Sequence, residues 1–184
     1  MNLSNIKFDG SWTLFLDRDG VINKKIENDY VKKWGSFQFL EGALDALGVF
    51  SKLFGHIVIV TNQQGIGKGL FTEDDLKSVH SNMVQVIQKE NGRVDKIYFC
   101  GALEREQSIY RKPNIGMAYQ AKSDFENIDF AKSIMIGDSI SDMQFGKTAG
   151  MKTLFITNQS MIHSLPDLID WEAKSIWEFS KKLI

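Results

Sequence analysis

Residues 14–23 read LFLDRDGVIN, and this stretch decides how the rest of the chain is interpreted. An apolar run that suits a buried strand ends in two aspartates, Asp17 and Asp19, and Gly20 follows at once. Side chains two residues apart point to the same side of a strand, so the two carboxylates are expected to lie close together. Like charges at short range raise each other's pKa unless a cation or a proton lies between them. The pair therefore indicates either a solvated strand end or a site that holds a positive group.

The composition indicates one globular domain over residues 1–184. The chain has 43% apolar residues, which is enough for a single well-formed core and short for two cores. Its 22 basic and 23 acidic residues give a net charge of -1, so we expect no binding to nucleic acid or to an anionic membrane surface. We expect a monomeric protein.

The cysteine content and the apolar runs indicate a cytoplasmic protein. Cys100 is the only cysteine, so the chain cannot form an internal disulfide. The first residues lack the uninterrupted apolar run that a signal peptide requires. The apolar runs HIVIV and SIMIG have the length of strands, which is too short to cross a membrane.

Short β-branched or aromatic runs alternate along the chain with segments of helical character. This alternation predicts a doubly wound, Rossmann-like α/β domain, in which a parallel sheet carries helices on both faces. The expected strands are residues 13–17, 56–61, 96–100, 133–137 and 153–156. The expected helices are residues 41–53, 72–91, 115–123, 142–147 and 176–183. The sequence TEDD at residues 72–75 has the form of a capping box.

Chemically active residue types follow the first four expected strands. Asp17 and Asp19 follow the first strand, Thr61 ends the second, Lys112 lies in the loop after the third, and Asp138 follows the fourth. Ligands of open parallel sheets bind at the carboxyl ends of the strands. We therefore expect these side chains to form one site at that edge of the sheet.

Four short sequences in this order resemble the motifs of the haloacid dehalogenase-type phosphohydrolases. They are DRDG at residues 17–20, Thr61 in VTNQQGIGKG, Lys112 in RKP, and GDSISD at residues 137–142. Within that superfamily, FLDRDGVIN, VIVTNQQGIGKGLFT and RKPNIGM are similar to sequences of the heptose bisphosphate and histidinol-phosphate phosphatases. The resemblance extends over residues 12–157 and implies a Mg²⁺-dependent phosphomonoesterase that acts on a small phosphorylated metabolite.

The resemblance also implies a role for each motif residue. Asp17 would attack phosphorus and form an aspartyl phosphate, while a protonated Asp19 would donate to the leaving alkoxide and later deprotonate the hydrolytic water. Thr61 and Lys112 would bind the transferring phosphoryl oxygens. Mg²⁺ would explain the paired carboxylates, because a cation must neutralise them before a phosphate dianion can approach. The implied metal site comprises Asp17, the backbone carbonyl of Asp19, Asp138 and Asp142.

Further residues of these motifs are candidates for binding the substrate. Arg111 can hold a phosphate or a hydroxyl through its planar guanidinium, but spacing does not decide whether Arg111 or Lys112 faces inward. Lys68 is either a solvated lysine or a cation that faces the substrate. The other candidates are Asn28 and Tyr30 in the loop at residues 27–30, and Asn62, Gln63 and Gln64 after the second strand.

Some of these residues also have purely structural interpretations. Thr61 and the amides after it can cap the next turn, and Tyr30 can pack against Trp34. The run GIGKG at residues 65–69 does not match the spacing of a nucleotide phosphate loop and is interpreted as a turn. No motif surrounds the histidines, so all three are interpreted as structural: His56, His80 and His163.

Two features of the resembled family are not expected in this chain. One helix and one strand already fill each segment between the motifs, which leaves no room for a cap domain. Heptose and histidinol members commonly carry Cys-x-His and Cys-x-Cys pairs that bind a structural Zn²⁺. Here Cys100 is present, but Ala102, Ser108 and Tyr110 occupy the other three positions. We expect Mg²⁺ and no zinc.

The substrate stays open between two phosphate esters. D-glycero-D-manno-heptose 1,7-bisphosphate, which would lose its 7-phosphate, is the first candidate because an open site suits a sugar phosphate. Histidinol phosphate is the alternative, and Glu27, Asp29 and Trp34 could contact its amine and imidazole. A phospho-accepting, receiver-like signalling domain also places Asp, Mg²⁺, Thr and Lys on a parallel sheet. Such a domain needs no acid two residues after its nucleophile, so Asp19 favours an enzyme.

Overall fold

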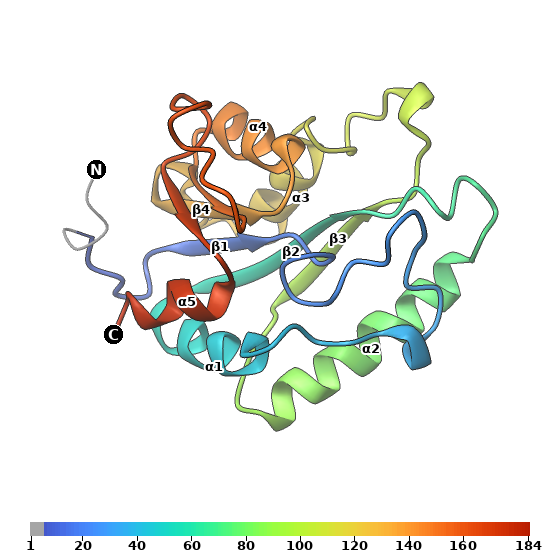
Figure 1. The fold of residues 1–184 in the computed structure, drawn as a ribbon, viewed down its shortest axis with the longest axis horizontal. Coiled ribbons are helices and arrows are strands. Elements are labelled where there is room, and N and C mark those ends of the chain that lie inside the picture. Colours follow the sequence, from blue (N-terminus) through green and yellow to red (C-terminus); the bar gives the residue numbers. More distant parts are fainter. Residues whose placement is uncertain (1–5) are drawn as a thin grey trace.

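Strand β1 (Thr13–Leu16) lies at the centre of a parallel sheet in the computed structural model, which describes residues 6–184 (Figure 1). The other strands are β2 (His56–Asn62), β3 (Lys96–Cys100), β4 (Ser133–Gly137), β5 (Lys152–Ile156) and β6 (Trp171–Ala173). They are ordered β3-β2-β1-β4-β5-β6, and every neighbouring pair is parallel. The predicted parallel sheet is confirmed.

Helices cover both faces of this sheet, as predicted. Helices α1 (Ala43–Leu53), α2 (Glu73–Lys89) and α5 (Ile176–Lys181) lie on one face, and α3 (Gly116–Asp124) and α4 (Ile140–Ala149) lie on the other (Figure 1). The 3₁₀ helices are η2 (Trp34–Ser36), η3 (Glu104–Glu106) and η4 (Phe130–Lys132). The predicted capping box at the start of α2 is confirmed between Thr72 and Asp75.

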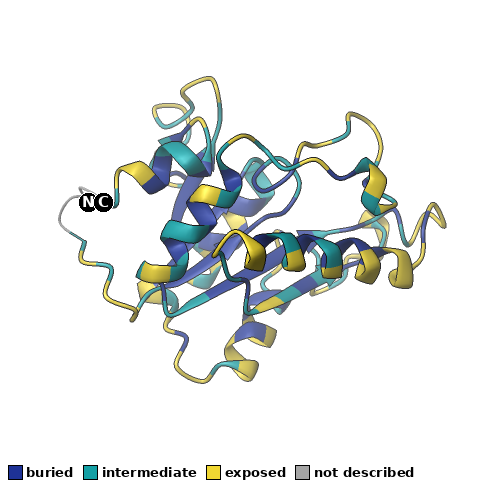
Figure 2. Ribbon diagram, turned by 90° about the horizontal axis from the view of Figure 1, so that it is seen from below, coloured by how far each residue is buried: buried dark blue, intermediate teal, exposed yellow. Residues whose placement is uncertain are grey.

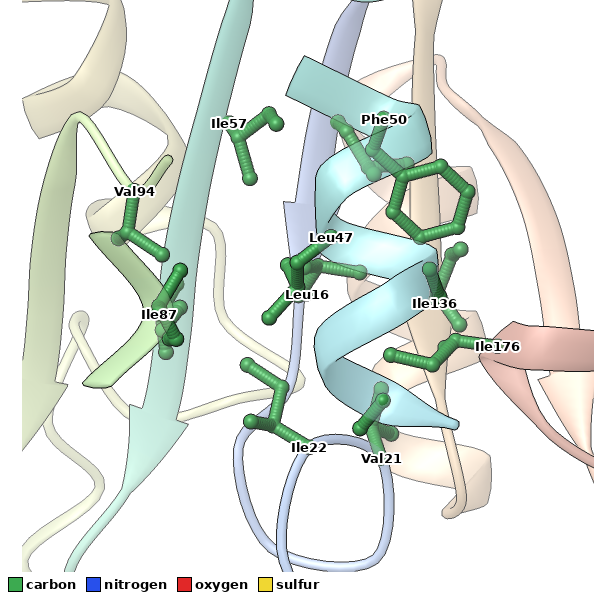
Figure 3. Packing of buried hydrophobic residues seen from close by; sticks show 14 of the residues in the cluster. Leu16, Val21, Ile22, Leu47, Phe50, Ile57, Ile87, Val94, Ile136 and Ile176 are labelled. Carbon is green, nitrogen blue, oxygen red and sulfur yellow. The ribbon is translucent and has the colours of Figure 1, made fainter. Parts of the chain in front are cut away.

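Alternating side chains of the central strand supply the two halves of the core. Leu14 and Leu16 are fully buried against α1, α2 and α5, whereas Phe15 is fully buried in the cluster that includes α3 and α4. Figure 3 shows α1 laid over the strands, with the buried side chains of Leu47 and Phe50 among the other residues of this cluster. The strands are buried and the outer faces of the helices are exposed (Figure 2). The alternation follows from the two-residue period of a strand.

The sequence prediction missed one strand, and several predicted element ends differ from the structure by one or two residues. Strand β6 was not predicted, because its three residues are too short to form an alternating run; its ladder to β5 places Leu154 opposite Trp171. Helix α4 begins at Ile140 and not at Asp142. Asp142 Oδ2 accepts hydrogen bonds from Ser139 N at 3.1 Å and Ser139 Oγ at 2.6 Å, so Ser139 caps the helix and the helix begins two residues earlier than predicted.

The strand order changes direction at the boundary between β1 and β4. From β1 the chain adds β2 and β3 on one side, and it then adds β4, β5 and β6 on the other side. The carboxyl ends of strands at such a point form a crevice in which ligands bind. Within residues 6–184 the segments between the motifs form the helices, strands and loops of this one sheet, in agreement with the expected lack of a cap domain. None of the helices in residues 6–184 is long and apolar enough to cross a membrane.

Candidate active site

Three carboxylates meet at the carboxyl ends of β1 and β4. Asp17 directly follows β1, Asp138 directly follows β4, and Asp142 lies in the first turn of α4. One oxygen of each carboxylate lies within 4.8 Å of the oxygens of the others. They line a cavity of about 230 Å³ together with other predicted site residues: Asp19, Tyr30, Thr61, Asn62 and Lys112.

Two glycines allow the carboxylates to approach so closely. A Cβ atom on Gly20 would overlap the Asp138 carboxylate, and a Cβ atom on Gly137 would overlap the side chain of Asp142. Gly20 also has a φ of +86°, in the left-handed region that glycine adopts without steric cost. Both positions therefore require glycine.

Lys112, and not Arg111, is the cation that faces the carboxylates. Its side chain is only 2% exposed, and Nζ lies 2.9 Å from Asp17 Oδ1 and 2.6 Å from Asp142 Oδ1. Nζ also donates to the carbonyl oxygen of Val60 at 2.7 Å. Burial alone would lower the pKa of Lys112, but Asp142 and Asp17 outweigh burial and raise that pKa. The ammonium is therefore a fixed positive charge in the site.

The pKa values of the two motif aspartates are shifted in opposite directions. Burial raises the pKa of Asp17 to about 7, and the lowering effect of Lys112 does not cancel this rise. Asp19 is also buried, but its pKa is lowered, because Arg18, Asn23 and Gln63 all donate hydrogen bonds to its carboxylate. The arrangement around Asp19 thus favours the ionised form.

Four donor contacts hold the Asp19 carboxylate in place. Arg18 Nη2 lies 3.0 Å from Oδ1 and 2.9 Å from Oδ2. Asn23 Nδ2 donates to Oδ1 at 2.9 Å, and Gln63 Nε2 donates to Oδ2 at 2.8 Å. Arg18 and Asn23 were not among the predicted site residues. The arginine between the two motif aspartates and the asparagine that ends the stretch LFLDRDGVIN were the available signals.

The side chains after β2 have different surroundings from those the sequence suggested. Gln63 is fully buried and also donates to Thr61 Oγ1 at 2.9 Å, so it lies behind the cavity wall and not at its surface. Asn62 makes two hydrogen bonds to the backbone of Lys112, both at 3.0 Å. Its Nδ2 donates to the carbonyl oxygen, and its Oδ1 accepts from the amide. Gln64 Oε1 accepts from Glu104 N at 2.9 Å, away from the residues that line the cavity.

The remaining predicted substrate residues lie around the cavity mouth or outside it. Tyr30 lines the cavity and packs against Phe71, with ring centroids 5.9 Å apart, and not against Trp34. Lys68 Nζ lies 3.2 Å from Tyr30 Oη. Asn28 is exposed and does not line the cavity. Arg111 lines a second hollow of about 750 Å³, which adjoins the first because both include Asn62, Lys112 and Ser141.

The carboxylate cluster fits a hard divalent cation. Asp138 Oδ1 is buried, and no group in residues 6–184 donates a hydrogen bond to it. Asp17 Oδ1 and Asp142 Oδ1 are likewise buried, and their contact is the ion pair with Lys112. Buried anionic oxygens without full compensation are costly, and carboxylate oxygens are the ligands that Mg²⁺ prefers. The donor set therefore matches the predicted Mg²⁺ site.

Lys25 is a further cation at the site, and the sequence interpretation missed it. Its Nζ lies 3.1 Å from Asp138 Oδ2, and its side chain is 60% exposed. Burial raises the pKa of Asp138, and Lys25 only partly opposes that rise. No motif includes Lys25, so the sequence carried no signal for it.

Replacement of Gly20 by alanine is expected to weaken Mg²⁺ binding by about 10- to 100-fold. Mutation of residues that orient metal ligands in other proteins has an effect of this size. The added Cβ would push away the carboxylate of Asp138. Isothermal titration calorimetry with Mg²⁺ measures the effect. Gly10→Ala is the matched control, because Gly10 has a φ of +83° but open space around its Cβ position. Equal Mg²⁺ affinity in both variants would contradict the proposed overlap.

The chain is similar to known phosphatases over most of its length. The family model of the polynucleotide kinase 3 phosphatases matches residues 6–153. A D-glycero-alpha-D-manno-heptose-1,7-bisphosphate 7-phosphatase from Burkholderia mallei is 39% identical over 151 residues, which are 78% of this chain and 78% of that protein. A D-glycero-beta-D-manno-heptose-1,7-bisphosphate 7-phosphatase from Yersinia pestis is 35% identical over 179 residues, which are 92% of this chain and 94% of that protein.

A solved structure of a phosphatase is also similar to this chain. The D,D-heptose 1,7-bisphosphate phosphatase from B. bronchiseptica, complexed with magnesium and phosphate, superposes with a TM-score of 0.83 and 26% sequence identity. The match covers 94% of this chain and 97% of that chain. The chain therefore belongs to the polynucleotide kinase 3 phosphatase family and is a phosphatase of the haloacid dehalogenase type.

Proposed function

We propose that the protein is a Mg²⁺-dependent phosphomonoesterase that acts through an aspartyl phosphate on Asp17. The position of Asp17 carries this proposal. Its carboxylate lies 2.9 Å from the buried ammonium of Lys112 and within a carboxylate cluster with Asp138 and Asp142. A nucleophile, a fixed positive charge and hard oxygen ligands are the groups that attack on a phosphate monoester requires.

Asp17, Asp138 and the backbone carbonyl of Asp19 would hold Mg²⁺, with Asp142 beside them. The bound ion would neutralise the negative charge of both the nucleophile and the phosphate. The oxygens of Asp142 already contact Ser139 and Lys112, which supports a role for Asp142 in orienting the other groups.

The chain's own residues would carry out the transfer in two steps. An oxygen of Asp17 attacks phosphorus as the bond to the leaving oxygen breaks, and Asp19 gives a proton to that oxygen. Asp19 then takes a proton from the water whose oxygen attacks phosphorus, and the Asp17 carboxylate is released. Lys112 and the Thr61 hydroxyl stabilise the phosphoryl oxygens in both steps. The negative phosphate brought next to Asp19 favours the protonated form that the first step needs.

We infer that the substrate is D-glycero-D-manno-heptose 1,7-bisphosphate and that the 7-phosphate is removed. The names of the relatives from B. mallei and Y. pestis support this substrate, and they differ only in the anomer. Three cations in and beside the two hollows suit a second phosphate: Lys25 lines the first hollow, Lys68 contacts Tyr30 in its lining, and Arg111 lines the second. The Nη1 atom of Arg111 is buried and receives no hydrogen-bond partner from residues 6–184.

The surroundings of the acidic and aromatic candidates favour this substrate over histidinol phosphate. Asp29 lines the cavity, but it pairs with Lys32 at 2.8 Å. Trp34 stacks on Phe37 with ring centroids 5.0 Å apart and does not line the cavity. Glu27 is exposed and outside the cavity lining as well. Few groups are thus available for an amine and an imidazole.

A kinetic screen with Mg²⁺ tests the substrate. We expect the highest kcat/KM for one anomer of the heptose 1,7-bisphosphate, lower values for histidinol phosphate and nucleotides, and no turnover of a 3′-phosphorylated DNA oligonucleotide, given the net charge of -1. EDTA should remove the activity and excess Mg²⁺ should restore it. Preference for the oligonucleotide or for histidinol phosphate would refute the substrate assignment, and full activity in EDTA would refute the metal dependence.

Asp17→Asn is expected to lower kcat on the order of 10⁴-fold or more, the scale seen when other enzymes lose a nucleophile. A neutral amide can neither attack phosphorus nor bind the metal well. Steady-state kinetics measure the loss, and circular dichroism checks that the variant is folded. Asp124→Asn is the matched control, because Asp124 also pairs with a lysine, Lys96 at 2.8 Å, but lies on α3 outside the cavity. Retention of more than a few per cent of the activity by Asp17→Asn would exclude Asp17 as the nucleophile.

We predict that the purified protein contains no stoichiometric zinc, because Cys100 is one thiol at a buried strand end. Hydrogen bonds support the loop at residues 101–110: Glu104 N donates to Gln64, and Gly67 N donates to the carbonyl of Gly101 at 3.0 Å. Elemental analysis after dialysis checks the prediction, with Cys100→Ser as the control for zinc bound at the thiol. One equivalent of zinc in the wild type that disappears in Cys100→Ser would show that the loop binds metal.

A further inference from the structure

Arg18 is a buried cation that the proposed reaction does not use directly. It lies between Asp17 and Asp19, and its side chain is fully buried although it carries a full charge. Arginine is almost never fully buried unless it is paired. Its partners therefore indicate what the residue does.

The Arg18 guanidinium connects two elements. On one side Nη2 contacts both oxygens of Asp19, and on the other Nη1 lies 3.0 Å from His80 Nε2. Nε of Arg18 is buried, and no group in residues 6–184 accepts a hydrogen bond from it. The direction of the guanidinium therefore depends on Asp19 and His80.

His80 is suited to be a fixed hydrogen-bond acceptor. It lies in the middle of α2 and is 7% exposed. The centroids of the His80 and Phe99 rings are 6.4 Å apart. Burial, and next the charge of Arg18, lower the pKa of His80 to about 3. The neutral ring can accept from Arg18 through Nε2 if its proton is on Nδ1, which is the tautomer that this contact requires.

We propose that His80 and Arg18 are positioning residues for Asp19, in a chain of contacts that runs from α2 through the guanidinium to the proton-transferring carboxylate. The inference rests on the proposed function, because Asp19 matters here as the group that transfers protons. Without the acceptor at residue 80, one side of the guanidinium loses its partner, and the fork is free to turn away from the two oxygens of Asp19. Proton transfer from Asp19 to the leaving oxygen depends on the direction of the carboxylate. A misplaced carboxylate should therefore slow this step in particular.

The choice of ester separates this role from a merely structural one. A primary alkyl phosphate needs a proton on its leaving oxygen, whereas the phenolate of p-nitrophenyl phosphate leaves without one. The value of kcat/KM reports the step in which the leaving group departs. A misplaced Asp19 should therefore slow the alkyl ester more than the aryl ester, whereas a general loss of structure should slow both equally.

The experiment measures kcat/KM with Mg²⁺ for the heptose bisphosphate, or the alkyl ester hydrolysed fastest in the screen, and for p-nitrophenyl phosphate. For His80→Phe we expect kcat/KM to fall by about 10- to 100-fold on the alkyl ester and by less than about threefold on the aryl ester. The loss on the alkyl ester should be part of the roughly 10²- to 10⁴-fold acceleration that a general acid contributes. His80→Gln keeps an acceptor and should recover most of the activity on the alkyl ester. His56→Phe is the matched control, because His56 also makes one hydrogen bond through Nε2, to Asn127 at 2.9 Å, but lies at the start of β2.

If His80→Phe does not fold, Arg18→Lys decides by the same criterion. Lysine keeps the charge, but one ammonium cannot reproduce the fork that contacts Asp19 and His80 together. An equal loss on both esters, or no loss, would overturn the inference while the proposed function stands. If the wild type hydrolyses neither ester with Mg²⁺, the proposed function fails, and this inference fails with it.

Discussion

The active site depends on the pairing of one buried ammonium, that of Lys112. Its Nζ lies 2.9 Å from Asp17 Oδ1, 2.6 Å from Asp142 Oδ1 and 2.7 Å from the carbonyl oxygen of Val60. Removal of one partner from a buried ion pair costs about 3–5 kcal/mol, a large share of the stability of a typical domain. The pairing therefore joins β1, β2, the start of α4 and the loop after β3, and it holds the proposed nucleophile, Asp17, against a fixed charge.

The sheet makes this pairing possible. β1 and β4 are neighbours in the sheet but distant in the sequence, so their carboxyl ends bring Asp17 next to Asp138. Packing on both faces fixes the strands, because Leu16 and Phe15 are fully buried on opposite sides. Gly20 has no Cβ atom, and a Cβ atom at this position would overlap the side chain of Asp138. The site is thus rigid at its base and is completed by loops.

The two aspartates of the motif are not equivalent. Asp17 lies deeper, and its pKa is raised to about 7, mainly by burial. Asp19 has its own cation, Arg18, and its pKa is lowered despite burial. The question of how two neighbouring carboxylates are tolerated therefore has two answers: Lys112 and the expected metal compensate Asp17, and Arg18 compensates Asp19. The different surroundings suit a nucleophile and a group that exchanges protons.

Much of the fold and of the candidate site could be predicted from the sequence because those signals are local. The alternation of apolar runs and helical segments determined the parallel sheet, and the position of each motif after a strand determined that Asp17, Asp19, Thr61, Lys112 and Asp138 share one edge. Periodicity and strand direction act within a few residues, so a single sequence records them.

Only the tertiary structure decided which way the side chains point and what they contact. It selected Lys112 over Arg111 as the inward cation, placed Gln63 behind the cavity wall, and revealed Lys25 and His80. His80 lies 62 positions from Arg18 in the chain, and no spacing rule connects them. Such contacts are decided by the packing of α2 against the sheet, where burial leaves each charged or polar atom few possible partners. That selection acts across space and not along the chain, which is why the sequence alone does not determine it.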